Sequence, residues 1–305
     1  MIRDVTLRDG LQLTGKPLPT GTKVELARAL LDLGVPELEI GSMARPDVVP
    51  PLADTLDVVA ALTAEELARC WVWVATPGHV RRAADAGVTR FQFCLSASDA
   101  HNQANLNRTT EKSMDTLPEA IDLARGVGGE IQLCLATSFT CPFEGQVAPE
   151  RVLELIADPR AAGADEIVVC DTLGQAVPAE VRDLVAAVRQ QDPRPVLFHG
   201  HDTWGAGVAN SLVALEAGAR AVDGCLGALG GCPFAPGAGG NTSTEDLLFA
   251  LRPEWLDPAR FATVVELGER LIDTLGEEHR SRARQGARAS TGRFPWAIGS
   301  SPEMS

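Results

Sequence analysis

The sequence lacks the features of a membrane, secreted or nucleic-acid-binding protein. No apolar stretch in its 305 residues is long enough to span a bilayer. The first residues run directly into a strand-like pattern, so we expect no signal peptide. The formal net charge is −14, and the absence of a basic block makes the chain a poor nucleic-acid binder. We therefore expect a cytoplasmic protein with neither membrane nor nucleic acid as a partner.

The cysteines give no sign of a disulfide framework. There are seven, an odd number, and five of them lie in or beside apolar, strand-like runs, namely Cys70, Cys94, Cys134, Cys170 and Cys225. This placement is typical of buried thiols in a reducing compartment. Cys141 and Cys232 differ because they lie in loop-like segments, where a substrate can reach a thiol.

Apolar runs alternate with amphipathic helical segments along most of the chain. The runs are rich in Val, Ile, Leu, Phe and Cys, which is typical of parallel strands buried on both faces. Strands are expected at 2–7, 36–41, 70–75, 90–96, 130–137, 166–171, 195–201 and 221–226, and helices at 20–33, 50–62, 77–86, 112–126, 149–162, 177–190, 205–217 and 242–251. Eight such units predict an α/β fold, a closed (β/α)8 TIM barrel. The alternative is a doubly wound open sheet, which the missing glycine fingerprint after the first strand disfavours.

The pattern changes after residue 252. We expect a TIM-barrel catalytic domain over 1–252 and a short C-terminal helical extension with an arginine-rich tail over 253–305, including one or two helices over 255–278. Five arginines among Ser, Gly and Ala in 279–294 favour a mobile, solvated tail, and a lid or an anion contact is the alternative. The segment Phe294-Pro295-Trp296 can pack on the barrel or on a neighbouring subunit.

The most informative stretch is His199-Gly200-His201-Asp202, at the end of an apolar run. Side chains alternate along a strand, so His199 and His201 point the same way, roughly 6.5–7 Å apart. Two imidazoles on one face of a strand end make half of a metal site, and two satisfied core histidines are the alternative. The chain has only five histidines, and their pairing here favours the functional interpretation.

Other polar side chains lie at predicted strand ends, where barrels of this kind carry their functional groups. They are Arg8 and Asp9, Glu39, Asp171 and Thr172, and Asn241 and Glu245 in and after the last loop. Glu39 lies inside an apolar run and needs a partner, because burying an unpaired carboxylate is costly. Asp9, His199, His201 and Asn241 form a mixed oxygen and nitrogen ligand set. This set suits Mg²⁺ or Mn²⁺, and Zn²⁺ or Co²⁺ can substitute.

Arg8 directly precedes Asp9, so on a straight strand the two side chains would face opposite ways. A kink at the strand end would bring both into the cavity. The alternative for Arg8 is a surface salt bridge.

Together these segments resemble the 3-hydroxy-3-methylglutaryl-CoA lyase family, whose members are metal-dependent TIM barrels. The resemblance covers residues 4–251, and the glycine-rich loop with Cys232 marks the lyase branch. Related synthases have Glu where Leu11 stands and usually carry a long regulatory domain. The anchors are Arg8-Asp9-Gly10-Leu11-Gln12, Ser96-Ala97-Ser98-Asp99, Cys141-Pro142-Phe143-Glu144-Gly145, Asp171-Thr172-Leu173-Gly174, the segment from His199 to Gly205, and the segment from Gly227 to Asn241.

The resemblance implies retro-Claisen cleavage of an acyl-CoA thioester to acetyl-CoA and a 3-oxo acid. Asp9, His199, His201 and Asn241 would bind the metal, and either Asp9 or His199 would be the base. Arg8 would stabilise charge on the thioester oxygen, and Cys232 would transfer a proton. Glu39 and Asp171 would orient the site, and Glu245 would support the metal loop. Substrate contacts are expected from Gln12, Ser42, Ser96, His101, Asn102 and Thr172, and we expect a homo-oligomer, a dimer.

Two segments at the rim depart from the family pattern. Leu13-Thr14-Gly15-Lys16 follows Gln12 where relatives continue Asn-Glu-Lys, and His101-Asn102-Gln103-Ala104 replaces a more hydrophobic, lysine-rich stretch. These polar side chains predict an acyl group that is more polar or longer than 3-methylglutaryl. The alternatives are a lyase for another 3-hydroxyacyl-CoA, a synthase that runs the condensation, and a non-catalytic metal-binding paralogue.

Overall fold

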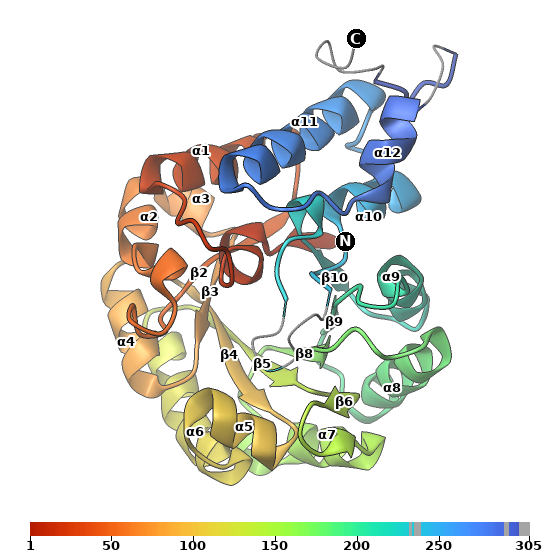
Figure 1. Ribbon diagram of the computed structural model, residues 1–305. Coiled ribbons are helices and arrows are strands. Elements are labelled where there is room, and N and C mark those ends of the chain that lie inside the picture. Colours follow the sequence, from red (N-terminus) through yellow and green to blue (C-terminus); the bar gives the residue numbers. More distant parts are fainter. Residues whose placement is uncertain (232–233, 235–238, 290–292, 299–305) are drawn as a thin grey trace.

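A computed structural model describes residues 1–231, 234, 239–289 and 293–298. Eight parallel strands close into a barrel in the order β1-β10-β9-β8-β5-β4-β3-β2, with helices around it (Figure 1). The barrel strands are β1 Ile2–Asp4, β2 Glu37–Ser42, β3 Cys70–Val74, β4 Arg90–Ser96, β5 Glu130–Ala136, β8 Glu166–Asp171, β9 Val196–Gly200 and β10 Ala221–Gly224. The predicted TIM barrel is confirmed, and the open-sheet alternative is wrong because each of these strands has a paired neighbour on both sides.

The helices follow the predicted order with some subdivision. Those of the barrel are α1 Thr20–Leu33, α2 Thr55–Ala61, α3 Ala64–Leu67, α4 Pro77–Asp85, α5 Asp99–Leu106, α6 Thr110–Gly126, α7 Pro149–Ala157, α8 Pro178–Gln191, α9 Gly207–Glu216 and α10 Thr244–Leu251. The segment predicted as one helix over 50–62 is a 3-10 turn, Pro50–Leu52, followed by α2. The pattern did not indicate α5, or the small hairpin of β6 Thr140–Cys141 and β7 Gly145–Gln146.

The first strand is shorter than the predicted 2–7. It ends at Asp4, and Thr6–Gly10 form one turn of π-helix, η1. The Asp4 carboxylate accepts hydrogen bonds from Thr6 N (2.9 Å) and from Thr244 Oγ1 (2.6 Å), which hold the change of direction. Single π-helical turns are frequent at functional sites. This turn is the kink that brings Arg8 and Asp9 to the same side.

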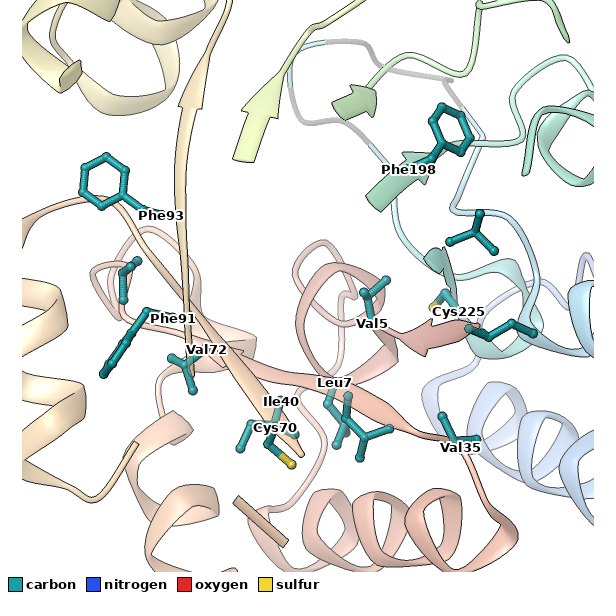
Figure 2. Close-up of a cluster of buried hydrophobic side chains, with 14 of the residues drawn as sticks. Val5, Leu7, Val35, Ile40, Cys70, Val72, Phe91, Phe93, Phe198 and Cys225 are labelled. Atoms are coloured by element: carbon teal, nitrogen blue, oxygen red, sulfur yellow. The ribbon is translucent and has the colours of Figure 1, made fainter. Parts of the chain in front are cut away.

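The main core fills the space between strands and helices. Figure 2 shows part of it, in which Ile40 and Phe91 from two barrel strands are buried together with Leu7 from η1. Both faces of the strands are covered, which explains their continuous apolar sequence. A second, smaller cluster of buried residues has as members Trp73, Ala75, Cys94, Cys134, Ala136, Val168, Cys170, Leu197 and Ala221.

The C-terminal extension is ordered where it is described. After α11 (Pro258–Leu275), the helix α12 (Arg282–Ala289) replaces the mobile tail that the composition favoured. Arg284 and Arg288 pair with Glu269 on α11 at 3.0 and 2.6 Å, so these charges are not free in solvent. Trp296 packs edge-on against Phe261 within the same chain. Among the described residues, no helix has the length and apolarity to cross a membrane.

We expect Gly10→Ala to destabilise the protein. A Cβ at Gly10 would lie 2.5 Å from Cys225 Sγ, so the buried Cys225 side chain or the backbone of η1 would have to shift. Overpacking of this kind costs about 1–3 kcal/mol. In the matched control Gly21→Ala, on α1, the new Cβ meets nothing within 4 Å. Urea unfolding of both variants measures the difference, and equal midpoints would show that the crowding at Gly10 is absorbed without cost.

Candidate metal centre

Three ionisable side chains meet where η1 approaches the end of β9. Asp9 comes from η1, His199 lies near the end of β9, and His201 follows that strand by one residue. One ligand atom from each lies within 4.8 Å of the other two, and all three residues are buried. The histidine rings are 5.2 Å apart between centroids. The prediction that the two imidazoles share a face is therefore confirmed, as is their proximity to Asp9.

Asn241 completes the predicted ligand set. It forms an isolated β-bridge with His201, and its Nδ2 donates to Asp9 Oδ2 (2.7 Å) and to Leu229 O (3.0 Å). Its Oδ1 is buried and has no hydrogen-bond partner in the described part of the chain. A buried oxygen without a partner is costly, and an amide oxygen is a good ligand for a hard divalent cation. One carboxylate, two imidazoles and one amide oxygen thus fit such a cation.

Each imidazole has one nitrogen engaged by the protein, which leaves the other for a ligand. His199 Nδ1 donates to Asp223 Oδ2 (2.9 Å), and His201 Nδ1 donates to Gly239 O (3.3 Å). Outer partners of this kind fix the tautomer and the orientation of a metal-binding histidine. Burial lowers the pKa of His201 to about 4, so its imidazole is neutral, as metal binding requires.

Sequence reasoning missed Asp223 and its partner Arg3. Arg3 Nε and Nη2 donate to the two carboxylate oxygens of Asp223 at 2.8 and 2.7 Å. Burial alone would raise the pKa of Asp223, but Arg3 and His199 hold it well below its usual range. In the same way, Asp223 raises the pKa of His199 against the effect of burial. The signal was present, since both residues are charged groups inside apolar strands, as Glu39 is.

Arg8 reaches into the same site. Its Nη1 donates to Asp9 Oδ1 (2.5 Å), and its Nε lies 3.8 Å from Glu39 Oε1. The guanidinium also lies over the Trp73 ring, 5.4 Å from the centroid. The side chain is only 13% exposed, so the surface salt bridge considered for Arg8 is wrong. Glu39 has the partner that its burial requires, although burial still raises its pKa.

Asp171 and Glu245 tie loops together near the ligands. Asp171 accepts hydrogen bonds from Gln175 N (3.0 Å) and Ala176 N (3.1 Å), and burial raises its pKa to about 6. Glu245 accepts from Gly227 N (2.9 Å) and from Ser243 Oγ (2.8 Å), and burial raises its pKa to about 8. These contacts are those of residues that hold loops in place. A part for Asp171 or Glu245 in catalysis stays a prediction.

The predicted substrate residues on β4 and α5 form a buried polar group. Ser96 Oγ bonds His101 Nδ1 (2.7 Å), and Ser96 N donates to Asn102 Oδ1 (2.8 Å). The Asn102 Nδ2 donates to Arg108 O (2.8 Å) and Ser113 Oγ (2.9 Å), so this amide already has partners at both ends. His101 Nε2 has none among the described residues. His101 is therefore the member of this group with a nitrogen unpaired in the described part of the chain, and substrate contact by Ser96, His101 and Asn102 stays a prediction.

The remaining predicted contacts lie at the end of a strand, in the case of Ser42 on β2, or in the segments that follow β8 and η1. Thr172 Oγ1 accepts from Thr137 N (2.8 Å), and Ser42 Oγ accepts from Ala44 N (3.1 Å). Gln12 follows η1 and is half-buried. Substrate contact by these three residues stays a prediction.

The two loop cysteines differ in what the structure describes. Cys232 lies outside the described residues. Cys141 is buried, and its Sγ accepts hydrogen bonds from Ser98 Oγ (2.9 Å) and from Phe143 N (3.3 Å) in the hairpin turn. Its thiol thus has a structural part in the turn. The described cysteines, all but Cys232, are free thiols, as expected.

Comparison with known proteins identifies the family. A family model described as HMGL-like matches residues 1–267. The chain belongs to the HMGL-like family. It is 38% identical over 258 residues to an (R)-citramalyl-CoA lyase of Chloroflexus aurantiacus, covering 81% of each chain. It is 33% identical over 251 residues to a hydroxymethylglutaryl-CoA lyase of Bacillus subtilis, covering 82% of this chain and 84% of that one. As an HMGL-like protein, it is a carbon–carbon lyase.

Solved structures of this HMGL-like family share the fold. An HMG-CoA lyase from Acinetobacter baumannii, in complex with coenzyme A and 3-methylmalate, superposes with a TM-score of 0.86 at 32% identity and covers 96% of both chains. The HMG-CoA lyase of Bacillus subtilis also gives 0.86, at 30% identity, over 93% of this chain and 96% of that one. The predicted lyase resemblance is confirmed at the level of the family.

We expect His201→Ala to abolish tight binding of a divalent cation. The loss of a direct ligand should weaken Mn²⁺ binding by more than the roughly 10–100-fold that follows loss of an outer partner. Isothermal titration with Mn²⁺ measures this. His79→Ala is the control, since His79 lies in α4 and accepts from Ala75 N. Equal affinity in the two variants would place the cation elsewhere.

Proposed function

We propose that this lyase cleaves a 3-hydroxyacyl-CoA thioester to acetyl-CoA and an oxo acid, with 3-hydroxy-3-methylglutaryl-CoA as the first candidate substrate. The observation that carries the proposal is the buried set of Asp9, His199, His201 and Asn241 beside Arg8. Among the relatives, one is named for citramalyl-CoA and others for hydroxymethylglutaryl-CoA, which supports a thioester that bears a 3-hydroxyl.

The ligand set would hold Mg²⁺ or Mn²⁺. When bound, a divalent cation supplies Lewis-acid polarisation of the substrate hydroxyl and of a neighbouring carbonyl or carboxylate oxygen. The free Oδ1 of Asn241 supports this fit, because the two histidines and Asp9 already face the same point. A non-catalytic paralogue would not need the buried Arg8 beside this set.

Different side chains then remove the proton and stabilise the negative charge that develops. Asp9 or His199 accepts the proton of the 3-hydroxyl, and the bond between C2 and C3 breaks. Arg8 and the two histidines outweigh the effect of burial and lower the pKa of Asp9, which keeps this carboxylate ionised. The guanidinium of Arg8 stabilises the enolate oxygen that forms on the thioester. Glu39, 3.8 Å from Arg8 Nε, holds that guanidinium in position.

Cys232 is the proposed donor of the proton to the enolate carbon. The described residues that flank it in sequence contact the site. A Cβ on Gly230 would lie 2.4 Å from Asn241 Nδ2, and the Phe234 ring lies 5.1 Å from that of His101. The engagement of the Cys141 thiol in its own turn also favours Cys232 for this step.

Acetyl-CoA release tests the proposal. Purified protein with Mg²⁺ or Mn²⁺ is given 3-hydroxy-3-methylglutaryl-CoA, citramalyl-CoA and longer 3-hydroxyacyl thioesters in parallel. We expect at least one to be cleaved, and the reverse condensation to be slower from acetyl-CoA and the matching oxo acid. Failure with every thioester in both directions would contradict the proposal.

We expect Cys232→Ala to keep its fold and its metal affinity but to lose turnover by roughly 10²–10⁴-fold, the range for removal of an acid or base. Cys141→Ala is the matched control for a loop thiol. Near-normal turnover of Cys232→Ala would leave that thiol without a part in proton transfer.

We expect His101→Phe to change the preference among thioesters. The His101 Nε2 without a partner can hydrogen-bond a polar acyl group, and a site built for such a bond strongly rejects analogues that lack the group. The measurement is the ratio of kcat/KM for the most polar thioester to that for 3-hydroxy-3-methylglutaryl-CoA. If wild type turns over the latter with ordinary efficiency and the ratio is unchanged, the rim does not set specificity.

A further inference from the structure

Three thiols lie in one buried cluster near the metal centre, and the proposed reaction uses none of them. Cys94, Cys134 and Cys170 come from β4, β5 and β8, which are neighbours in the barrel. Cys94 and Cys134 are partners in register, and Cys134 Sγ lies 3.5 Å from Cys170 Sγ. Two thiols of different strands are thus in direct contact.

These thiols differ from Cys70, the cysteine of barrel strand β3, which packs beneath the helices. Cys94, Cys134 and Cys170 keep 4–5% of their surface accessible, whereas Cys70 keeps 1% and belongs to the core between strands and helices. Cys170 is the register partner of His199, so the cluster borders the metal centre. A small solute bound at the candidate metal centre would therefore lie beside the thiol cluster.

The separation of the pair suits one bridging atom. Two sulfurs that each bond the same atom at roughly 2.3 Å lie about 3.5–3.8 Å apart when the bond angle is near tetrahedral. The observed 3.5 Å lies within that range. The two side chains thus need little movement to bind one thiophilic centre together.

The charges around the thiol pair favour an uncharged ligand over a cation. Arg8 lies within electrostatic range of Cys94 and Cys134, so the cluster already faces a fixed positive charge. A divalent cation would add charge of the same sign in a buried place, which is costly. An uncharged species that condenses with protonated thiols avoids this cost.

We propose that Cys134 and Cys170 form a binding site for uncharged trivalent metalloid hydroxides, of which arsenous acid is the simplest. Two As–O bonds break and two As–S bonds form, and the thiol protons leave with the two hydroxyl groups as two molecules of water. Arsenic stays trivalent and no oxidant is needed. Cys170 is the register partner of His199 and Cys134 lies within electrostatic range of Arg8, so the adduct would form beside the candidate metal centre.

The test is arsenite binding to the full-length protein, measured as arsenic per chain after desalting. We expect one arsenic per wild-type chain and its release by an added small dithiol. Cys134→Ala and Cys170→Ala should each lose the bound arsenic. Cys70→Ala and Cys232→Ala should retain it, the first as a buried-thiol control and the second because it removes the loop thiol.

Peptide mapping of the wild-type adduct locates the arsenic without any variant, which decides the matter if an alanine variant does not fold. Absence of arsenic from wild type, or its retention in either Cys134→Ala or Cys170→Ala, would overturn the proposal. None of these readouts depends on turnover, so failure of the proposed lyase reaction leaves the thiol-pair result intact.

Discussion

A buried ion pair between Arg3 and Asp223 holds one imidazole of the candidate metal centre in place. It joins β1 to β10, and Asp223 in turn holds His199 on β9. Both side chains are buried, so each charge requires the other, and loss of one partner from such a pair typically costs about 3–5 kcal/mol. Arg3 Nη1 also donates to Gln132 Oε1 on β5, across the barrel (2.7 Å). The orientation of one imidazole therefore depends on residues from four strands.

The barrel holds a second polar layer at the amino ends of its strands. Glu37 accepts hydrogen bonds from Arg90 (3.2 Å) and Arg220 (3.1 Å), and Arg220 also bonds Glu166 (2.8 Å). The charges of this layer are paired with one another. At the carboxyl ends, by contrast, the amide oxygen Oδ1 of Asn241 is a buried acceptor without a hydrogen-bond partner among the described residues. This contrast matches the division in TIM barrels between a stabilising face and a functional face.

Periodicity and spacing predicted most of the fold and the common face of the two histidines, because both depend on local sequence. Eight apolar runs indicated the closed barrel, and the spacing of His199 and His201 indicated a shared face. The turn at Thr6–Gly10 could not be predicted in the same way. The Asp4 carboxylate that holds it binds Thr244, 240 residues away. Asp223 could have been singled out from the sequence, because it is a charged residue inside an apolar strand, as Glu39 is. Its role could not, because that depends on which strands are neighbours in the barrel.

The prediction of a mobile tail in the C-terminal segment was wrong for a related reason. Its arginines, with small polar neighbours, suggested a solvated tail, whereas Arg284 and Arg288 have a common partner in Glu269 on the preceding helix. A carboxylate on α11 was not recognisable as that partner before the two helices were placed side by side. The composition of a segment does not show which other segment it packs against, and here the contacts with α11 hold α12 in place.

The extension also holds the loop that carries Asn241. Asp246, in the first turn of α10, accepts hydrogen bonds from Ser281 Oγ (2.8 Å) and from the backbone nitrogens of Arg282 (3.0 Å) and Ala283 (2.5 Å). The helix α10 begins three residues after Asn241, so the docked extension restrains the start of that helix. A boundary at residue 252 divides the sequence pattern, but the metal centre receives support from both sides of it. The last helices thus help to position Asn241, the proposed fourth ligand.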